Sequence, residues 1–160
     1  MDLLANTLTR EQGKPLQKAV GEVEETASYF EEIAGQSIPC DILKDDARER
    51  IEVRRKPFGV VAAILPWNFP LSLAAWKIGQ ALLAGNTIVL KPSPYTPLST
   101  LKMGEFLEDV VPHGVLNIIS GGNNLGAAIT TNPRVRRSPS RVRWQPEKEL
   151  LRLRRLISNT

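Results

Sequence analysis

One short segment combines a restricted backbone with a hydrogen-bond donor. Residues 66–70 read PWNFP, so two prolines and two aromatic side chains surround Asn68. A side-chain amide in a fixed orientation can donate to a developing oxyanion, which makes Asn68 a candidate catalytic residue. The same residues suit a simple strand-to-helix turn, with Pro70 at the first helical position. Taken alone, the segment favours the simple turn.

A second candidate is the lysine of the segment KPSP at 91–94. The Lys91 ammonium can reach ribose hydroxyls or a phosphate, and the hydroxyl of Ser93 can donate beside it. A solvated lysine that closes a strand is the alternative, and on this segment alone it is the better interpretation.

Glycines mark a third candidate, in the segment SGGNNLG at 120–126. Gly121 and Gly126 lie around a predicted helix start, where backbone N–H groups can approach a phosphate closely. The spacing does not match the dinucleotide-binding pattern G-x-G-x-x-G, and Gly/Asn turns are common. An amide, an ammonium and a glycine turn at three successive strand ends together favour a nucleotide-type ligand.

The elements that must position these residues alternate along the chain. Continuous apolar or β-branched runs predict buried strands, and apolar residues at helical spacing predict helices between them. This alternation indicates an α/β fold with a parallel sheet, whose ligands bind beyond the carboxyl ends of the strands. The predicted strands are 59–65, 86–90 and 114–120, and the predicted helices are 70–84, 97–110 and 124–131.

Three further segments precede this region. Apolar residues at helical spacing predict an amphipathic helix over 15–36. Residues 37–48 are polar and contain Pro39, so we expect a connection. Residues 50–56 alternate apolar and charged side chains, which predicts a half-exposed strand.

Composition excludes several classes of function. No apolar run approaches the roughly 18 residues of a membrane span, and the N-terminus lacks a signal-peptide pattern. Cys40 is the one cysteine and His113 the one histidine, so neither an intrachain disulfide nor a Cys/His zinc cluster is expected. We therefore expect a cytoplasmic protein with no membrane partner and no metal.

The basic charge is confined to one end of the chain. The net charge is +4, but residues 1–133 hold 12 basic and 15 acidic residues, whereas residues 134–160 hold 9 and 2. Arg-rich spacing and Trp144 in the tail are compatible with nucleic-acid binding. The region before the tail is mildly acidic, so we expect no nucleic-acid partner.

The ordered string PFGVVAAILPWNFPLSLAAWKIGQALLAGNTIVLKPSPYTPLS at 57–99 closely resembles the aldehyde dehydrogenase superfamily. The segments 8–23 and 112–135 resemble it too, in its order and spacing, so the resemblance covers nearly all of 1–136. Members of the superfamily are several times longer. The resemblance implies an incomplete Rossmann-like cofactor-binding region that uses NAD or NADP to oxidise an aldehyde to a carboxylic acid.

Residue by residue, the resemblance assigns roles at the strand ends. Asn68 matches the asparagine whose amide stabilises the thiohemiacetal oxyanion. Lys91 matches the lysine that contacts the adenosine ribose. Gly121 and Gly126 lie beside the adenosine and pyrophosphate. The segment that lines the cofactor cleft matches Ile64, Leu65, Pro66 and Trp67.

Two departures from the family follow. Pro94 stands where many members have a ribose-binding glutamate, so the resemblance implies either cofactor. The nucleophilic cysteine and general-base glutamate of the family lie further downstream, and Cys40 does not match the nucleophile. His113 is expected to be structural. We therefore expect the 160-residue chain to be inactive alone and the aldehyde to be a substrate only of an intact relative.

The tail departs from the family entirely. The resemblance predicts a strand and a Phe-Thr-Gly-Ser phosphate site after residue 136, whereas residues 137–160 are basic and contain an amphipathic segment at 148–157. Codons can be chosen for residues 137–160 so that the same nucleotide string, read one base out of frame, encodes Phe-Thr-Gly-Ser. This favours two regions, an aldehyde dehydrogenase-like region at 1–136 and a frameshift-derived tail at 137–160. A non-catalytic protein that binds nucleotide, or docks on an oligomer through 51–56, is the alternative to an enzyme fragment.

Overall fold

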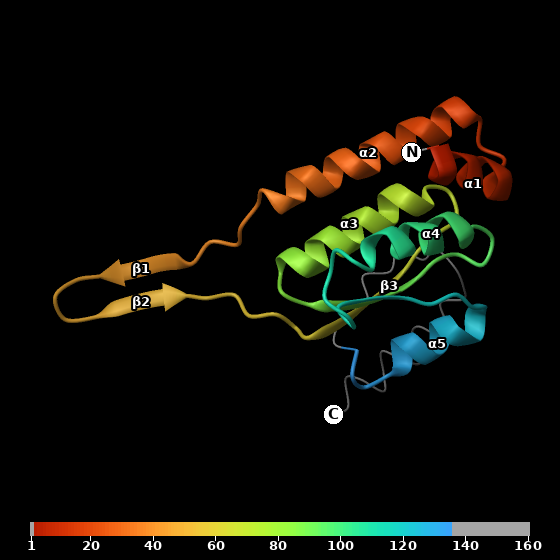
Figure 1. Ribbon diagram of the computed structural model, residues 1–160. Coiled ribbons are helices and arrows are strands. Elements are labelled where there is room, and N and C mark those ends of the chain that lie inside the picture. The colour runs from red at the N-terminus through yellow and green to blue at the C-terminus, as the bar shows by residue number, and fades with distance from the viewer. Residues whose placement is uncertain (1, 136–160) are drawn as a thin grey trace.

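A three-stranded parallel sheet with helices on both faces forms the centre of the molecule. The computed structural model describes residues 2–135. The strands are β3 (Val60–Ile64), β4 (Thr87–Lys91) and β5 (Leu116–Ile118), in the order β3-β4-β5. Helices α3 (Pro70–Leu83) and α4 (Leu98–Leu107) cover one face, and α5 (Asn123–Thr131) lies on the other (Figure 1). The predicted α/β class is confirmed.

The apolar runs form strands because both faces of the sheet are covered. Ala62 and Ala63 of β3 are fully buried, as is Leu90 of β4. In the parallel register Ala63 lies opposite Leu90, and Leu90 lies opposite Ile118. Residues hidden on both sides give a continuous apolar run rather than an alternating one.

The three strands of the sheet follow one another in chain order from β3 outward. The chain runs from β3 through α3 to β4, and through α4 to β5, so the sheet grows in one direction. Helix α5 then returns across the opposite face to contact β3. Within residues 2–135 the outer edge of β3 has no partner strand. Open α/β sheets bind ligands beyond the carboxyl ends of their strands, so that edge is where a site is expected.

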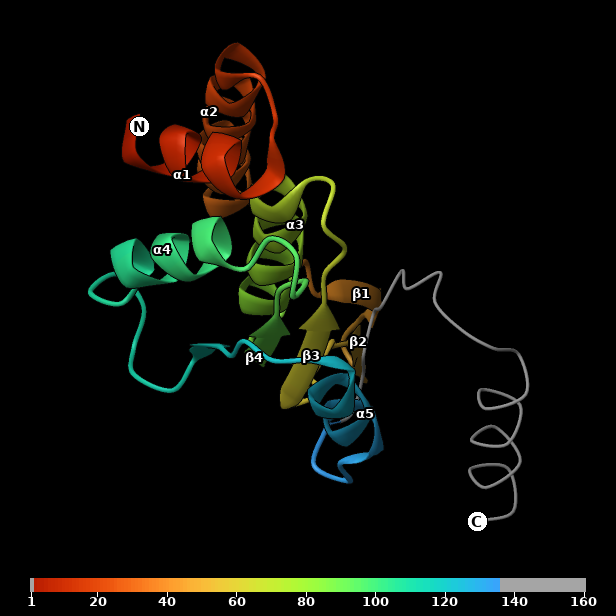
Figure 2. The ribbon, with the colours of Figure 1, turned by 90° about the vertical axis from the view of Figure 1, so that its right-hand side faces the viewer.

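Two N-terminal helices form a further layer over α3 and α4. They are α1 (Asp2–Gln12) and α2 (Leu16–Ala34), and Figure 2 shows them on the side of α3 and α4 away from the sheet. Close packing depends on Gly79 of α3, because a Cβ there would lie 3.0 Å from side-chain atoms of Tyr29 and Ile33 of α2. The apolar core that joins the layers includes Ala5, Leu8, Ala19, Val23, Leu71, Ile78, Ile88 and Leu90.

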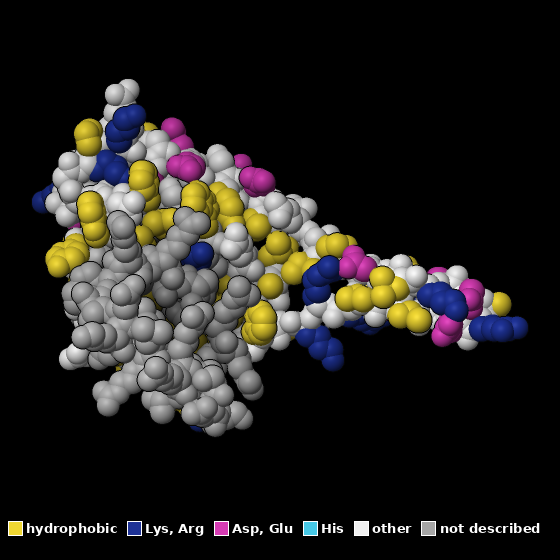
Figure 3. Space-filling model, turned by 180° about the vertical axis from the view of Figure 1, so that it is seen from behind, with side chains coloured by type: hydrophobic (Ala, Val, Ile, Leu, Met, Phe, Trp, Pro, Cys, Tyr) yellow, Lys and Arg dark blue, Asp and Glu magenta, His cyan; other side chains and the backbone are white. Residues whose placement is uncertain are grey.

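The prediction of a plain connection over 37–48 is wrong. Residues 41–45 form β1 (Asp41–Asp45), which pairs antiparallel with β2 (Arg50–Val53) in a hairpin. The hairpin extends away from the body, with apolar and charged side chains both exposed (Figure 3). Its turn is closed by the carboxylate of Asp46, which accepts hydrogen bonds from the N–H groups of Arg48 (2.8 Å) and Glu49 (3.0 Å). These bonds lower the pKa of Asp46.

Several predicted elements have the right type and different ends. The helix expected over 15–36 is α2, and the helix expected over 97–110 is the shorter α4. Residues 50–56 and 114–120 contribute the short strands β2 and β5. Helix α1 was not predicted. The amphipathic segment at 148–157 lies outside the described residues. None of the helices within 2–135 is long and apolar enough to cross a membrane.

Candidate functional site

The carboxyl ends of the three strands meet at one edge of the sheet, as predicted. The N–H of Leu65, directly after β3, donates to the carbonyl oxygen of Lys91 at the end of β4, at 2.9 Å. The N–H of Ile119, directly after β5, donates to the carbonyl oxygen of Leu90, also at 2.9 Å. The three candidate segments therefore lie side by side.

The Asn68 turn has a fixed backbone and an exposed side chain. The carboxamide Nε2 of Gln12 donates to the carbonyl oxygens of Trp67 (2.9 Å) and Asn68 (2.7 Å). The ammonium of Lys14 donates to the same carbonyl of Asn68 at 3.3 Å. The hydroxyl of Thr96 donates to the carbonyl of Trp67 at 3.3 Å, which joins this turn to the loop after β4. Asn68 itself is exposed, so its amide is accessible to a ligand.

A buried carboxylate supports the helix that follows the turn. Glu22 of α2 is 3% exposed and accepts hydrogen bonds from the N–H groups of Leu71 (3.0 Å) and Ser72 (3.3 Å) in the first turn of α3. It also forms an ion pair with Lys14. A carboxylate at this position satisfies free N–H groups and complements the positive end of the helix dipole.

Sequence reasoning missed Gln12, Lys14 and Glu22. The contacts of Gln12 cross 55 and 56 positions, so no local pattern indicates them. For Glu22 a signal existed. It lies among Ala19, Val23 and Thr26 on the buried stripe of α2, and a charged residue on a core-facing stripe requires a buried partner.

Lys91 is buried at the centre of the site. The residue is 3% exposed, and its Nζ donates a hydrogen bond to the carbonyl oxygen of Pro92 at 3.3 Å. Burial lowers the pKa of Lys91 below its ordinary value of 10.5. The hydroxyl oxygen of the neighbouring Ser93 accepts a hydrogen bond from the N–H of Tyr95 at 3.2 Å, so Ser93 shapes the loop and keeps its own proton for donation.

The glycine segment begins α5 and contacts the end of β3. A Cβ on Gly121 would lie 2.6 Å from Cδ2 of Leu125, so only glycine fits without a shift. Gly126 is less restricted, because a Cβ there would lie 3.7 Å from Cδ1 of Ile64, an ordinary contact. This proximity places α5 against the last residue of β3. All the predicted strand-end residues are thus brought to one edge of the sheet.

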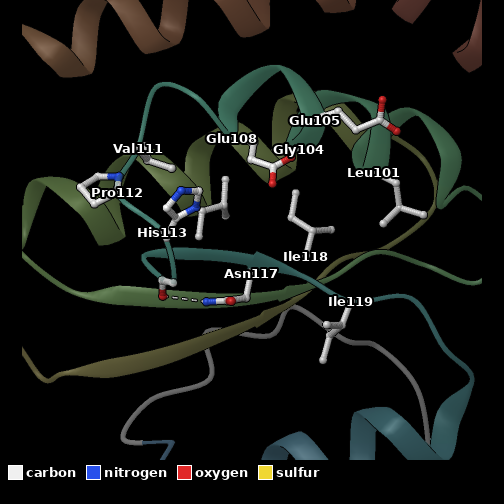
Figure 4. Close-up of a pocket in the computed structure, with 12 residues that line it drawn as sticks. Leu101, Gly104, Glu105, Glu108, Val111, Pro112, His113, Asn117, Ile118 and Ile119 are labelled. Atoms are coloured by element: carbon white, nitrogen blue, oxygen red, sulfur yellow. Dashed lines mark hydrogen bonds between the residues drawn. The ribbon is translucent and has the colours of Figure 1, made fainter.

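The groove between α4 and β5 is separate from this site. Its volume is about 400 Å³, and it is lined by His113, Glu105, Glu108 and Ile118 among others (Figure 4). Glu105 pairs with Lys102, and the amide of Asn117 donates to the carbonyl of Gly114 at 2.8 Å. None of the predicted site residues lines it.

Cys40 lies outside the site as well. It directly precedes β1, it is a free and exposed thiol, and its Sγ lies 3.7 Å from Oε2 of Glu52 on β2. The hairpin that carries it projects from the body of the molecule (Figure 1).

The profile of the aldehyde dehydrogenase family matches residues 1–137. The chain belongs to the aldehyde dehydrogenase family.

Individual relatives of this family are similar over most of the chain. A 3,6-anhydro-alpha-L-galactose dehydrogenase of Vibrio sp. (strain EJY3) is 47% identical over 134 residues, which is 81% of this chain and 28% of the relative. The NADP(+) succinate-semialdehyde dehydrogenase GabD of Escherichia coli is 44% identical over 141 residues, or 85% of this chain and 29% of the relative.

The fold is also similar to that of solved structures. PnpE from Pseudomonas sp. WBC-3, also solved in complex with nicotinamide adenine dinucleotide, superimposes with a TM-score of 0.82 at 40% identity. The match covers 87% of this chain and 30% of PnpE. The chain therefore spans less than a third of the length of these relatives.

The residues at the strand ends fit a dinucleotide. Lys91 is a cation buried beside carbonyl groups, and a ligand with several hydroxyl or phosphate oxygens would supply the acceptors it lacks. Gly121 lets the backbone before α5 pass close to the side chain of Leu125. Both residues lie at the carboxyl edge of the sheet, where open α/β sheets bind ligands.

Proposed function

We propose that this chain forms the cofactor-binding part of an NAD(P)-dependent aldehyde dehydrogenase. The observation that carries the proposal is the position of buried Lys91 at the carboxyl edge of the sheet, beside Ile64 at the end of β3. Membership of the family supports it.

Each strand end has its own part in holding the cofactor. The ammonium of Lys91 donates to the hydroxyls of the adenosine ribose, with Ser93 beside it. The N-terminus of α5, at Gly121 and Gly126, receives the pyrophosphate, since free N–H groups and the helix dipole favour an anion there. The wall of the cleft is formed by Ile64, Leu65, Pro66 and Trp67. When bound, NAD or NADP supplies the acceptor for the hydride of the aldehyde.

Asn68 acts on the substrate rather than on the cofactor. Its side-chain N–H donates to the oxygen of the aldehyde as negative charge develops there during attack by a thiolate. Cys40 is held on the projecting hairpin, away from Asn68, so it does not supply that thiolate. We therefore propose that the 160-residue chain binds cofactor without oxidising aldehydes.

Binding and turnover can be tested separately on the purified chain. Titration calorimetry with NAD and with NADP is expected to detect binding that is lost in Lys91→Met and kept in Lys77→Met, a control on α3. Binding of neither cofactor, or equal binding by both variants, would contradict the cofactor assignment. An aldehyde-dependent increase in the absorbance of the reduced cofactor would contradict the proposed inactivity.

The hairpin favours a second function, assembly of copies of this chain or of its relatives. Four large apolar residues of β1 and β2 are more than 40% exposed, namely Ile42, Leu43, Ile51 and Val53. A monomer gains nothing from exposing them, whereas an interface buries them. Sedimentation analysis is expected to show an oligomer that Ile51→Lys dissociates. A monomer at all concentrations would exclude this function.

We also propose that residues 137–160 come from a shifted reading frame. The family match ends at residue 137, within the basic region that begins at residue 134. Sequencing of the transcript across codons 134–138 is expected to reveal a one-base change relative to the frame of the family. An intact frame there would show that the tail is a genuine part of the protein.

A further inference from the structure

Side chains of the N-terminal segment contact the turn that carries Asn68. Gly13 has a φ of +76°, a conformation suited to glycine, and its N–H donates to the carbonyl of Thr9 at 2.9 Å. This ends α1 and reverses the chain before α2. As a result, Gln12 and Lys14 on either side of Gly13 both reach the turn at 67–69.

Gln12 uses its carboxamide mainly as a donor. Both carbonyls that it binds, those of Trp67 and Asn68, belong to consecutive residues of the turn. Its Oε1 is buried and has no hydrogen-bond partner among the described residues. A buried acceptor without a partner costs free energy, so this residue is held here for its N–H groups.

Lys14 holds the other side of the same turn. Its Nζ donates to the carbonyl of Asn68 at 3.3 Å and lies 4.2 Å from the centre of the Phe69 ring. The ion pair with Glu22 fixes the ammonium in that position. Asn68 therefore has its backbone fixed by two side chains while its own side chain is exposed.

We propose that Gln12 and Lys14 are positioning residues that orient the amide of Asn68 for hydrogen bonding to the oxyanion. The inference rests on the proposed function of Asn68 as the oxyanion donor. Preorganised donors stabilise a transition state because they need no reorientation during the reaction. A rotation of the backbone at 67 or 68 would move the Asn68 amide, and the two bonds of Gln12 oppose that rotation.

The test measures the order of the Asn68 side chain in the full 160-residue chain by ¹⁵N relaxation. The order parameters of the backbone amides at 67–69 are expected near about 0.85 and are expected to fall below about 0.6 in Gln12→Met, and the order parameter of the Asn68 NH₂ group is expected to fall with them. Lys14→Met is expected to give a smaller fall. Should Gln12→Met fail to fold, Lys14→Met carries the same test.

Two controls separate positioning from general stability. Asn6→Ala removes an amide of α1 that donates to the carbonyl of Asp2 in the same helix, and Leu8→Ala weakens the packing of α1. Both are expected to leave the order of Asn68 unchanged, although Leu8→Ala lowers the thermal midpoint. Unchanged order in Gln12→Met and Lys14→Met, or an equal loss in Leu8→Ala, would overturn the proposal. Since the readout involves no cofactor, failure of the chain to bind NAD or NADP would contradict the proposed function alone.

Discussion

The carboxylate of Glu22 accepts a hydrogen bond at 3.0 Å from the backbone N–H of Leu71, 49 residues later in the chain. The bond joins the N-terminal helical layer to the first turn of α3, directly after the turn that carries Asn68. The stability of the layer and the geometry of the candidate site therefore depend on the same side chain.

Glu22→Ala is expected to lower the free energy of unfolding by about 3 kcal/mol, because it leaves Lys14 and two helix N–H groups without their partner. Glu25→Ala, an exposed position on the same helix, is expected to change it by less than about 0.5 kcal/mol. Urea denaturation measures both. Equal effects of the two variants would show that Glu22 has no special role.

Lys91→Met is expected to stabilise the chain at neutral pH. Because burial lowers the pKa of Lys91 below 10.5, the folded chain loses this proton before the unfolded chain does. The free energy of unfolding therefore rises with pH between the lowered pKa and 10.5. At pH values below that interval the lysine is charged in both states, and its burial lowers the free energy of unfolding by the full amount. The advantage of Lys91→Met should be largest near pH 7 and shrink as pH approaches 10.5. Urea denaturation of both proteins across this range gives the difference, and a constant difference would be inconsistent with a buried charge.

Gly121→Ala and Gly126→Ala are expected to have opposite effects. The new Cβ at 121 would lie 2.6 Å from Leu125 Cδ2 and 3.2 Å from its Cβ, so the Leu125 side chain must move and the backbone must adjust slightly, at a cost of about 1–2 kcal/mol. At 126 the Cβ finds ordinary contact, and alanine gains about 0.5–1 kcal/mol of helix propensity. Thermal unfolding distinguishes them. Destabilisation by Gly126→Ala of the same size would mean that α5 packs differently.

Gly79→Ala is expected to loosen the packing of α2 against α3 and to lower the free energy of unfolding. The new Cβ would lie 3.0 Å from side-chain atoms of Tyr29 and Ile33. The packing cost of about 1–3 kcal/mol exceeds the gain in helix propensity. Gly21 of α2 has no atom within 4 Å of the corresponding position, so Gly21→Ala is expected to stabilise. Chemical denaturation that ranked the two variants in the reverse order would contradict close packing at Gly79.

The buried parallel sheet could be predicted from sequence because its apolar runs are continuous. The strands Val60–Ile64 and Thr87–Lys91 are mainly apolar. The end of the second apolar run predicts that Lys91 lies at the carboxyl edge of the sheet, which is where it is found. Strand β1 could not be predicted, since DILKD carries three charges in five residues. It is a strand because β2 lies beside it and ion pairs such as Arg50–Asp45 join the two.

The contacts that hold the candidate site in place could not be predicted from local sequence patterns. Asn68, Lys91 and Gly121 each stand at a strand end, a position that the pattern of the chain predicts. Gln12 stands at the end of α1, which buries only Ala5 and Leu8 and so shows weak periodicity. Its bonds to the turn are a property of the packed molecule alone.

Two carboxylates of the N-terminal helices accept hydrogen bonds from the first N–H groups of α3 and α4, and this affects folding during synthesis. Glu11 of α1 accepts hydrogen bonds from the N–H groups of Leu98 and Ser99, which follow it by 87 and 88 positions. The ribosome therefore releases both glutamates long before the helices that they bind. Since non-local contacts of this kind form slowly, α1 and α2 can complete their packing only after Ser99 has emerged from the exit tunnel.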